Sequence, residues 1–524
     1  MGKRVKTLSV FTILLLVALA GRLYYIQIVC HPALSEGAKD QQVIHVQSEN
    51  ERGTIYDRNL VKLTDTCNTY YYLINRENCT VGLERIMKSI DAELAGTKGD
   101  DYLVYKTDHF NQAVNEKLRK EYDAYGFCRG SRYEDHQTAA HLIGYVSGEN
   151  KSGAAGLEKQ FQSRLASQDS SLSMIGSGTG EPFYGIGVKE TREREQISPS
   201  SLITTIDSAL QKKVEIIMEE EGITGAVVVL QTETGQVLSM ASTPTFNPNA
   251  LEEYLHSQSG ELVNKAVQGQ YPPGSVFKIV VAAAALESGM VSLDDTFDCD
   301  GSTEVNGVTL TCDGKEEGHG KVDFTQAFAK SCNCFFAQAA KTIGAETIID
   351  MAQRLGLSEK VLEGFSEEET GRFPDQEERS YSGLSNLAIG QGSLLTTPLQ
   401  IAAMTNVIAN GGIDRPVSVV RSQNHEEAEG QRVLTNVTAA EVAEMMEKVC
   451  TEGTAADSNT HVAIAGKTGS AEAGNGTDGV VHGWFTGYFP AEDPEYTVTV
   501  IAEDGKTGSG SALPVFEKIV NYLY

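Results

Sequence analysis

A serine and a lysine lie three residues apart where an apolar stretch begins, and these two side chains can together carry out acyl transfer. The preceding residues 271–274 hold two prolines and a glycine, so a helix is predicted to begin at or just after Gly274. On that helix Ser275 and Lys278 share one face. The positive helix end favours negative charge near the hydroxyl, and burial lowers the pKa of a lysine amine, which lets it act as a base. The pattern predicts a serine nucleophile activated by lysine instead of histidine.

We call this Ser-x-x-Lys pair the first motif. By itself it is weak, because a helix-capping serine beside a surface lysine has the same spacing. The chain contains the pattern only once. Two further groups of residues later in the chain strengthen the catalytic interpretation.

The second motif is Ser331-x-Asn333, a hydroxyl and an amide that are two residues apart. In a turn between helices both side chains can face a cleft, where the hydroxyl could relay a proton and the amide could hold a substrate carbonyl. An ordinary turn or helix cap is the alternative that this pair alone leaves open.

The third motif is Lys467-Thr468-Gly469, in a predicted strand that begins near Ala463. We expect the lysine to offer a fixed positive charge and the threonine a hydroxyl for a carboxylate, while the glycine lets a ligand approach the backbone closely. A phosphate-binding loop is excluded, because it needs a glycine where this chain has His461 and a helix where this chain has a strand.

A second Lys-Thr-Gly, at residues 506–508, follows the last predicted strand. It also lacks the phosphate-loop glycine, since position 500 is valine. Its Gly/Ser-rich surroundings indicate a turn before the final helix.

The elements around the motifs predict an α+β domain with an antiparallel sheet packed on helices. Strands are expected at both ends of the domain, with helices between them, and the helix that carries the first motif is apolar nearly all round, which indicates burial. The other expected elements are helices at 207–221 and 514–523 and strands at 225–230, 236–241, 463–471, 483–489 and 496–502.

The N-terminus begins with basic residues and continues into an apolar segment, which places the first residues in the cytoplasm. The apolar character resumes after Arg22, giving roughly 20 residues, so we predict an uncleaved anchor over a signal peptide cleaved after Ala20. The expected division is a cytoplasmic tail (1–6), a transmembrane anchor (7–29), a pedestal or dimerisation-like domain with a linker at 169–201 (30–200), and a catalytic domain (201–524). Everything after the anchor is expected to be extracytoplasmic.

Composition narrows the possible partners. Acidic residues outnumber basic ones by 71 to 43, giving a formal charge of −28, which argues against nucleic-acid binding.

The nine cysteines contain no Cys-x-x-Cys pair, and no cluster has zinc spacing. Cys299 and Cys312 flank a polar loop and could form a disulfide in an oxidising compartment. Cys332 and Cys334 are expected to point apart on a helix.

The three motifs, in this order, resemble the set found in penicillin-binding proteins and class A β-lactamases. Other segments resemble class B penicillin-binding proteins, the membrane-anchored peptidoglycan transpeptidases of division, elongation and sporulation. The resemblance is strong from residue 202 onward and patchy between 31 and 200. Two positions depart from the usual pattern: Cys332 within the second motif, and Ser470 after the third, where threonine is usual. The other segments are 52–59, 156–158, 271–275, 319–320, 390–392, 397–400 and 484–488.

The resemblance implies an acyl-enzyme mechanism. Ser275 would attack the carbonyl between the last two D-alanines of a peptidoglycan stem peptide, and Lys278 would take its proton. Ser331 would relay a proton to the leaving D-alanine, after which an amine of a neighbouring stem forms the cross-link. β-Lactams would acylate the same serine, and no cofactor or metal is implied.

The resemblance also implies binding roles. Asn333 would hold the amide backbone of the substrate, while Lys467 and Thr468 would recognise its terminal carboxylate beside Gly469. The backbone amides of Ser275 and Ser470 would form the oxyanion hole, whose donors are typically worth about 3 kcal/mol each in the transition state.

Several alternatives stay open at this point. A D,D-carboxypeptidase or a β-lactamase would hydrolyse the acyl-enzyme, although no water-activating glutamate can be assigned between the second and third motifs. A non-catalytic scaffold for wall synthesis is the rival from another class. Membrane lipid is the expected partner of the N-terminal helix. A membrane glycosyltransferase is expected as well, because no glycosyltransferase domain is recognised in the chain. Division or elongation proteins are further expected partners.

Overall fold

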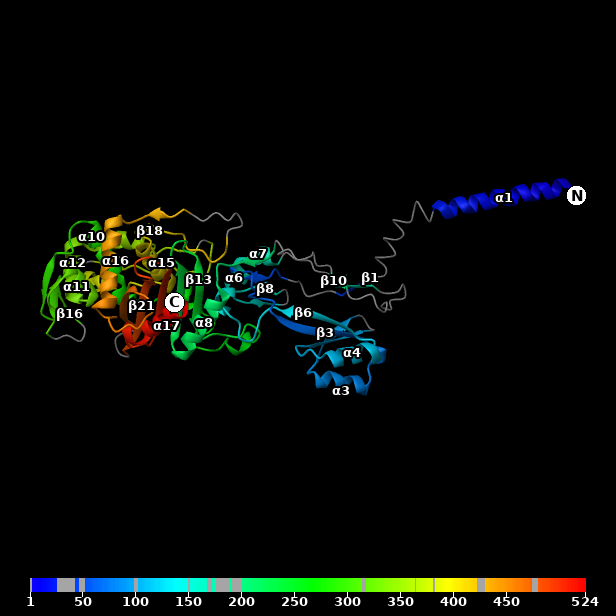
Figure 1. The fold of residues 1–524 in the computed structure, drawn as a ribbon, viewed down its shortest axis with the longest axis horizontal. Helices are drawn as coiled ribbons and strands as arrows, with labels where there is room; N and C mark the ends of the chain where they lie inside the picture. Colours follow the sequence, from blue (N-terminus) through cyan, green and yellow to red (C-terminus); the bar gives the residue numbers. More distant parts are fainter. Residues whose placement is uncertain are drawn as a thin grey trace. The chain divides into compact units, whose positions relative to one another are not determined.

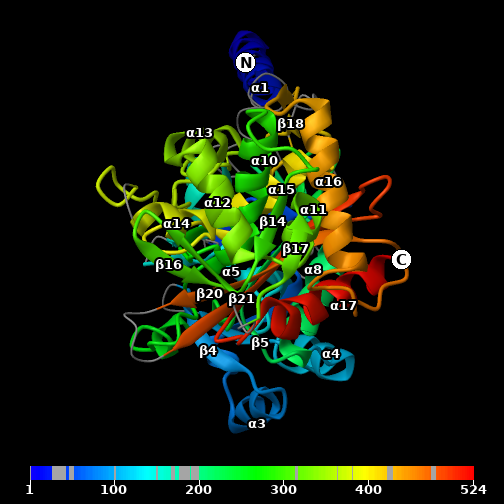
Figure 2. The ribbon, with the colours of Figure 1, turned by 90° about the vertical axis from the view of Figure 1, so that its left-hand side faces the viewer.

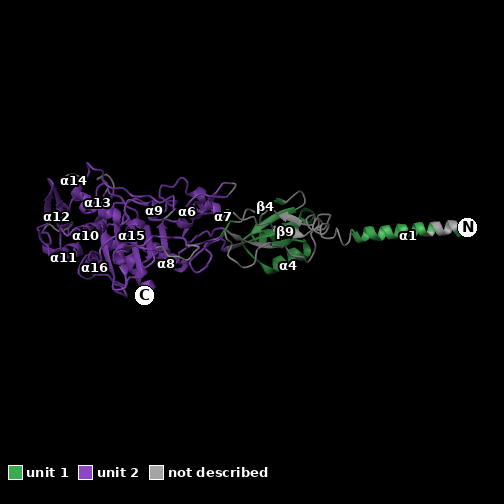
Figure 3. Ribbon diagram, turned by 90° about the horizontal axis from the view of Figure 1, so that it is seen from above, with its two compact units in different colours: residues 1–53, 67–131, 166–200 green, residues 54–66, 132–165, 201–524 purple. Residues whose placement is uncertain are grey.

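The computed structural model describes residues 2–25, 43–46, 52–98, 102–148, 151–166, 172–175, 189–190, 200–312, 317–362, 364–379, 382–421, 429–473 and 479–524. The chain divides into two compact units, which are coloured separately in Figure 3. Unit 1 comprises residues 1–53, 67–131 and 166–200, and unit 2 comprises residues 54–66, 132–165 and 201–524. Most of the predicted linker at 169–201 lies outside the described residues.

Unit 2 is built on a five-stranded antiparallel sheet with the strand order β13-β12-β22-β21-β20 (Figure 1). The Thr/Val alternation near the C-terminus forms a central strand, because its β-branched residues pack well on a pleated surface that is covered on both faces. All the strands expected in this domain are present. They are β12 (Thr224–Gln231), β13 (Val237–Thr243), β20 (Ala465–Ala473), β21 (Val480–Phe489) and β22 (Tyr496–Glu503).

Helices pack on both faces of this sheet (Figure 2). On one face lie α15 (Pro398–Ala409) and α16 (Asn436–Thr451), and α8 (Ser208–Glu220) and α17 (Leu513–Leu523) pack together against the other. Helix α15 begins sharply because Thr397 and Gln400 form a capping box around a proline in the first turn. The predicted α+β architecture is confirmed.

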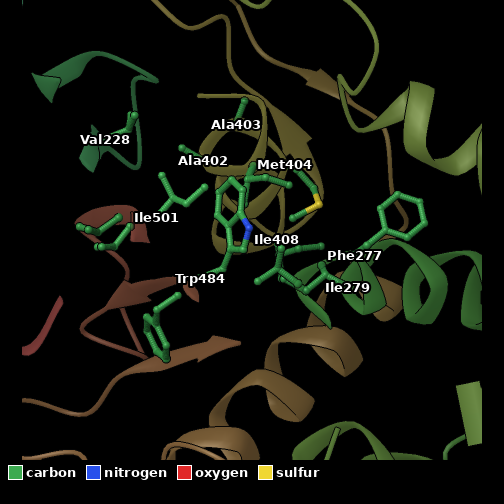
Figure 4. Close-up of a cluster of buried hydrophobic side chains, with 14 of the residues drawn as sticks. Val228, Phe277, Ile279, Ala402, Ala403, Met404, Ile408, Trp484 and Ile501 are labelled. Atoms are coloured by element: carbon green, nitrogen blue, oxygen red, sulfur yellow. The ribbon is translucent and has the colours of Figure 1, made fainter. Parts of the chain in front are cut away.

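The first motif lies at the start of a buried helix, as predicted. A short 3₁₀ turn, η4 (Gly274–Phe277), leads into α10 (Lys278–Glu287), whose residues 278–285 are all buried. Figure 4 shows the apolar cluster around its beginning, where Phe277 and Ile279 meet Trp484 of β21 and Met404 of α15. This packing joins the helix to the sheet and leaves the helix start little freedom to move.

The remaining elements of unit 2 surround this core. Short hairpins precede and follow the helices, and the early segments of the chain add small elements to the same unit. They are β2 (Ile55–Tyr56), α5 (Ala140–Ile143), β7 (Val146–Ser147), β8 (Ser152–Gly153), α6 (Gly156–Gln160), α7 (Gln162–Leu165), β11 (Leu202–Ile203), η3 (Leu251–Glu253), α9 (Lys265–Gln268), β14 (Thr296–Cys299), β15 (Ser302–Val305), β16 (Val308–Thr311), β17 (Gly320–Asp323), α11 (Phe324–Ala329), α12 (Asn333–Ile343), α13 (Ala345–Arg354), α14 (Ser382–Ala388), β18 (Ile413–Asp414), β19 (Gln431–Arg432) and η5 (Gly508–Ala512).

Unit 1 contains a four-stranded antiparallel sheet in the order β4-β5-β3-β6, and a small second sheet in the order β1-β9-β10. Its compact core gathers Tyr72, Leu83 and Leu118 from the larger sheet and two helices. The elements are α1 (Gly2–Tyr24), β1 (Val43–Val46), β3 (Cys67–Asn75), η2 (Arg76–Asn78), α3 (Val81–Ser89), β4 (Glu93–Lys98), β5 (Tyr102–Thr107), α4 (Gln112–Glu121), β6 (Tyr125–Ser131), β9 (Leu172–Ile175) and β10 (Lys189–Glu190).

The segment predicted as a membrane anchor is helical over most of its length in α1, and residues 26–29 lie outside the described residues. In the part of the chain that the structure describes, no helix reaches the length and apolarity needed to cross a membrane.

Candidate active site

The serine of the first motif is held by a segment that is hydrogen-bonded to neighbouring elements. The amide of Gly274 donates to the carbonyl of Gly390 over 2.8 Å, and the indole Nε1 of Trp484 donates to the carbonyl of Pro272 over 3.0 Å. Gly274 has a φ of +55°, and a Cβ there would lie 2.6 Å from the carbonyl oxygen of Ser470. Only glycine allows this approach, which brings the half-buried Ser275 next to β20.

The lysine of the first motif connects it to the second. Lys278 is fully buried, and its Nζ donates to Asn333 Oδ1 over 2.7 Å, to the carbonyl of Ser331 over 2.8 Å and to Ser331 Oγ over 3.1 Å. The same Nζ lies 5.4 Å from the ring centroid of Phe336. These contacts bring the amine of Lys278 to both functional residues of the second motif.

The second motif lies in a tight turn between α11 and α12. Ser331 has a φ of +56°, in the left-handed region, and this turns both motif side chains toward Lys278. Asn333 uses its oxygen for the lysine and donates its Nδ2 to the carbonyl of Thr311 over 3.1 Å, which fixes the amide orientation. The structure thus has a turn at the second motif, and both of its functional side chains contact Lys278.

The third motif lies in β20, at the edge of the sheet. Lys467 is completely buried, and its Nζ donates to the carbonyl of Thr468 over 3.0 Å and lies 5.7 Å from the ring of Phe328. Burial, together with the positive charge of Lys278, holds the pKa of Lys467 well below its usual range. The surroundings of Lys467 therefore disfavour the positive charge that was expected on it, unless an anion binds beside the amine.

The hydroxyl of Thr468 has a partner that sequence reasoning missed. Its Oγ1 lies 2.5 Å from Oγ1 of Thr454, in the loop after α16. A hydroxyl that accepts from Thr454 is free to donate its own proton to a carboxylate, so Thr454 can orient the predicted carboxylate ligand. The sequence carries no signal for this contact, because Thr454 is exposed and stands in an unremarkable loop.

Gly469, the last residue of the third motif, and Ser470, the residue after it, are closely packed against neighbouring segments. A Cβ at Gly469 would lie 3.0 Å from Val276 and 3.2 Å from the carbonyl of Pro273, so glycine lets the strand lie against the nucleophile segment. Ser470 is exposed, and its Oγ accepts from the amide of Gly508 over 3.3 Å. The second Lys-Thr-Gly, interpreted as a turn, thus leads into the π-helical turn η5 that supports Ser470.

A cluster of cysteines adjoins the second motif, contrary to the expectation from their spacing. The ligand atoms of Cys299, Cys312, His319 and Cys332 all lie within 4.8 Å of one another. Three thiols and one imidazole are a donor set typical of structural zinc sites. A fifth sulfur, that of Cys334, lies 3.5 Å from the Sγ of Cys312.

The sequence leaves open whether Cys299 and Cys312 are paired, and in the structure both are free, with their sulfurs 3.7 Å apart. The expectation for the other two cysteines is wrong. Cys332 and Cys334 do not point apart, because Cys332 precedes α12 in an extended conformation, which lets both sulfurs approach Cys312. The Cys332 thiol hydrogen-bonds to Cys312 and lowers the pKa of Cys312 to about 4, as suits a metal-binding thiolate. A bound zinc would be structural and would hold Cys332, which lies between the two second-motif residues.

A buried glutamate between the second and third motifs bears on the hydrolytic alternatives. Burial raises the pKa of Glu368 to about 6. Its two oxygens accept from the amides of Val361 and Leu362 over 2.8 and 2.9 Å. These bonds hold the loop that carries Glu368.

Comparisons with known proteins agree with this geometry. The family model described as penicillin binding protein transpeptidase domain matches residues 225–521. Penicillin-binding protein PbpB of Mycolicibacterium smegmatis is 30% identical over 84% of this chain and 74% of its own length. Peptidoglycan D,D-transpeptidase MrdA of Acinetobacter baumannii is 27% identical over 97% and 86%, and stage V sporulation protein D of Bacillus subtilis is 26% identical over 96% and 82%.

Solved structures give the same fold. A chain from a peptidoglycan synthase complex that coordinates polymerization and crosslinking superposes with a TM-score of 0.73 at 25% identity, covering 98% of this chain and 97% of its own. Penicillin-binding protein PBP2 of Helicobacter pylori, solved in complex with MreC, superposes with a TM-score of 0.69 at 22% identity, covering 92% and 99%.

Proposed function

The chain belongs to the class B penicillin-binding protein transpeptidases, and from this membership we propose that its three motifs form the active site of a peptidoglycan D,D-transpeptidase. The observation that carries the proposal is the position of one amine. Lys278 Nζ contacts both functional residues of the second motif, while the segment before Ser275 lies against the third. Residues from three distant parts of the chain thereby meet at the segment that carries Ser275 and Lys278.

The acylation step follows from these positions. Ser275 Oγ attacks the carbonyl between the last two D-alanines, and its proton passes to the amine of Lys278, three residues along the chain. The bond to the terminal D-alanine then breaks, and its nitrogen takes a proton that reaches it through the hydroxyl of Ser331. The product is an ester between Ser275 and the stem peptide.

Binding of the stem peptide uses the edge strand β20. Among the described strands β20 is one of the two edge strands of its sheet, so we expect one side of its backbone to receive an extended peptide. The terminal carboxylate would bind near Lys467 and the hydroxyls of Thr468 and Ser470. That negative charge would restore a favourable environment for a protonated Lys467, which makes carboxylate binding and protonation of this amine favour each other.

The acyl-enzyme is finally resolved by an amine of a neighbouring stem, which gives the cross-link and restores the serine. Water as the acceptor would make the protein a D,D-carboxypeptidase, which is the second candidate because the first half-reaction is identical. A β-lactamase is disfavoured, because the buried Glu368 is occupied by backbone amides. A scaffold without activity would not need the contacts of Lys278.

Location and partners complete the proposal. We retain an N-terminal anchor at residues 7–29 and an extracytoplasmic catalytic unit, supported by the basic and apolar pattern of the first residues. A membrane glycosyltransferase and elongation or division proteins are the proposed partners. The related structures, one solved in complex with MreC and one in a peptidoglycan synthase complex, support wall-synthesis partners of this kind.

The test is labelling of the full chain in detergent with a fluorescent penicillin, with Ser275→Ala beside the wild type. We expect a stable label on the wild type and none on the variant, whose fold should be intact because one hydroxyl contributes only about 1 kcal/mol. A label that vanishes within seconds would identify a hydrolase. No label on a folded wild type would refute the active-site assignment. Cross-linking of a stem pentapeptide to an acceptor amine then separates transpeptidase from carboxypeptidase.

A further inference from the structure

We propose that Lys265, Tyr271 and Glu503 form a positioning triad that holds the segment before Ser275 in its acylating geometry. The inference rests on the proposed function, since it concerns the acylation rate. None of the three belongs to the three motifs. They come from α9, from the segment before η4 and from the end of β22, so the triad ties three elements together at one carboxylate.

Each oxygen of the Glu503 carboxylate has its own partner. Oε1 accepts from the hydroxyl of Tyr271 over 2.7 Å, and Oε2 accepts from Lys265 Nζ over 2.6 Å. Lys265 and Tyr271 are buried, with 5% and 8% of their surface exposed. Hydrogen bonds to an ionised group are short and strong, and both become stronger away from water. The carboxylate therefore holds the tyrosine hydroxyl in one place.

The ring of Tyr271 is confined as well as its hydroxyl. A Cβ at Gly269 would lie 2.4 Å from the ring, so the ring occupies space that only glycine leaves free. His482 and Trp484 meet the ring edge-on, with centroids 5.4 and 6.1 Å away. Polar and apolar contacts thus fix the same side chain.

The position of Tyr271 is transmitted to Ser275 by a stiff connection. Only Pro272, Pro273 and Gly274 separate the two residues, and each proline ring locks its φ angle. The backbone of Tyr271 exchanges two hydrogen bonds with Thr396, both 2.9 Å long. A displaced tyrosine would therefore move the serine instead of being absorbed by the chain between them.

Such a displacement matters to the chemistry more than to the fold. A reacting atom misplaced by 1 Å can cost about 10²-fold in rate, because the reaction needs near-attack geometry. The triad should therefore affect the rate constant of acylation, whereas binding of a β-lactam, which depends mostly on β20 and the third motif, should change little.

The experiment measures acylation of the full chain in detergent by a fluorescent penicillin in stopped flow, over a range of concentrations. Tyr271→Phe keeps the ring and removes only the hydroxyl. We expect the limiting acylation rate constant to fall about tenfold, equivalent to about 1.4 kcal/mol, with the half-saturating concentration unchanged.

A matched control is Tyr254→Phe, which removes another hydrogen-bonded tyrosine hydroxyl of unit 2, the acceptor for the amide of Asn247. It should leave the rate constant unchanged. Glu503→Gln leaves the buried Lys265 ammonium without its charge partner and should slow acylation further. Adding Lys265→Met to Glu503→Gln removes the unpaired charge and should restore part of the rate.

Two results would overturn the triad. One is an unchanged rate constant for Tyr271→Phe while the wild type is labelled and Ser275→Ala is not. The other is an equal loss of rate in Tyr271→Phe and Tyr254→Phe that follows the melting temperature, which would show a stability effect. A folded wild type that takes no label would instead overturn the proposed function, and the triad with it.

Discussion

Two clusters of polar side chains in unit 2 differ in the hydrogen-bond partners of their basic residue. In one, Arg132 donates from Nε to Glu158 over 2.7 Å and from Nη1 to Asp65 over 3.0 Å, and Tyr133 donates to Glu158 over 3.0 Å. In the other, Lys278 donates to the carbonyl and hydroxyl of Ser331 and to the amide oxygen of Asn333. The first cluster joins its cation to carboxylates, and the second joins its amine to the residues of the second motif.

The pKa values follow this difference. Burial alone would lower the pKa of Arg132, but the carboxylates of Glu158 and Asp65 raise it above its usual value. Lys467, buried near a second lysine, has its pKa held well below the usual range. The carboxylates favour the charged form of Arg132, whereas burial and the nearby Lys278 favour loss of the proton from Lys467. The structural cluster and the candidate active site are thus distinguished by the partners of their cations, since both are buried.

The largest effect is expected from Lys278→Ala. Without its base, the serine should be acylated about 10²–10⁴-fold more slowly by fluorescent penicillin. The melting temperature should be measured in parallel, so that the rate is compared between folded proteins. A wild-type acylation rate in this variant would show that another group takes the serine proton.

Arg132→Met should lower the stability of the fold and leave the acylation rate unchanged. Removing one partner of a buried ion cluster leaves uncompensated carboxylates and costs about 3–5 kcal/mol of the free energy of unfolding, measured by urea denaturation. The fraction that stays folded should be acylated at the wild-type rate. A slower rate per folded molecule would mean that this cluster also acts on the active site, and the contrast between the clusters would fail.

The cluster of Cys299, Cys312, His319 and Cys332 could hold a metal ion, whose positive charge would pair with thiolates. We expect one zinc per chain by mass spectrometry of the native protein, lost in Cys299→Ser. At free zinc of 100 times its Kd, binding should stabilise the fold by about 2.7 kcal/mol, seen as a lower melting temperature after chelation. Cys79→Ser, in unit 1, is the control. Equal metal content in both variants would contradict the site.

The smallest expected effect is the contribution of Lys467 to the pH dependence of the free energy of unfolding. Its pKa is lower in the folded state than in the unfolded chain, so between these two values the unfolded chain binds more protons and stability rises with pH. Above the unfolded pKa the cost of burying this amine disappears. Lys467→Met should therefore be more stable than the wild type at pH 7, with the difference shrinking toward pH 10.5.

Urea denaturation at the two pH values measures this difference. Lys518→Met, which removes an exposed amine paired with Glu221, serves as the control and should show no such convergence. A Lys467→Met variant that is less stable than the wild type at pH 7 would show that the buried amine is favourably paired.

The motifs and most elements were predictable from the sequence because they depend on local chemistry. Proline and glycine before Ser275 mark the start of a helix, the apolar run after it marks a buried helix, and Thr/Val alternation marks a central strand. The family resemblance followed from the order of three short motifs. These features need only the residue types and their spacing along the chain.

The partners of the side chains were decided by tertiary structure. No spacing rule connects Lys278 to Ser331, or Thr454 to Thr468, since each contact arises when separate elements pack on one sheet. The cysteines illustrate the limit most clearly: Cys332 and Cys334 were expected to diverge on a helix, but a turn before α12 brings both sulfurs to Cys312. The sequence by itself determined which groups the protein has for acyl transfer. Only the packed fold decided which of them lose water and meet, because burial and distance set the pKa of an amine and the pairing of a charge.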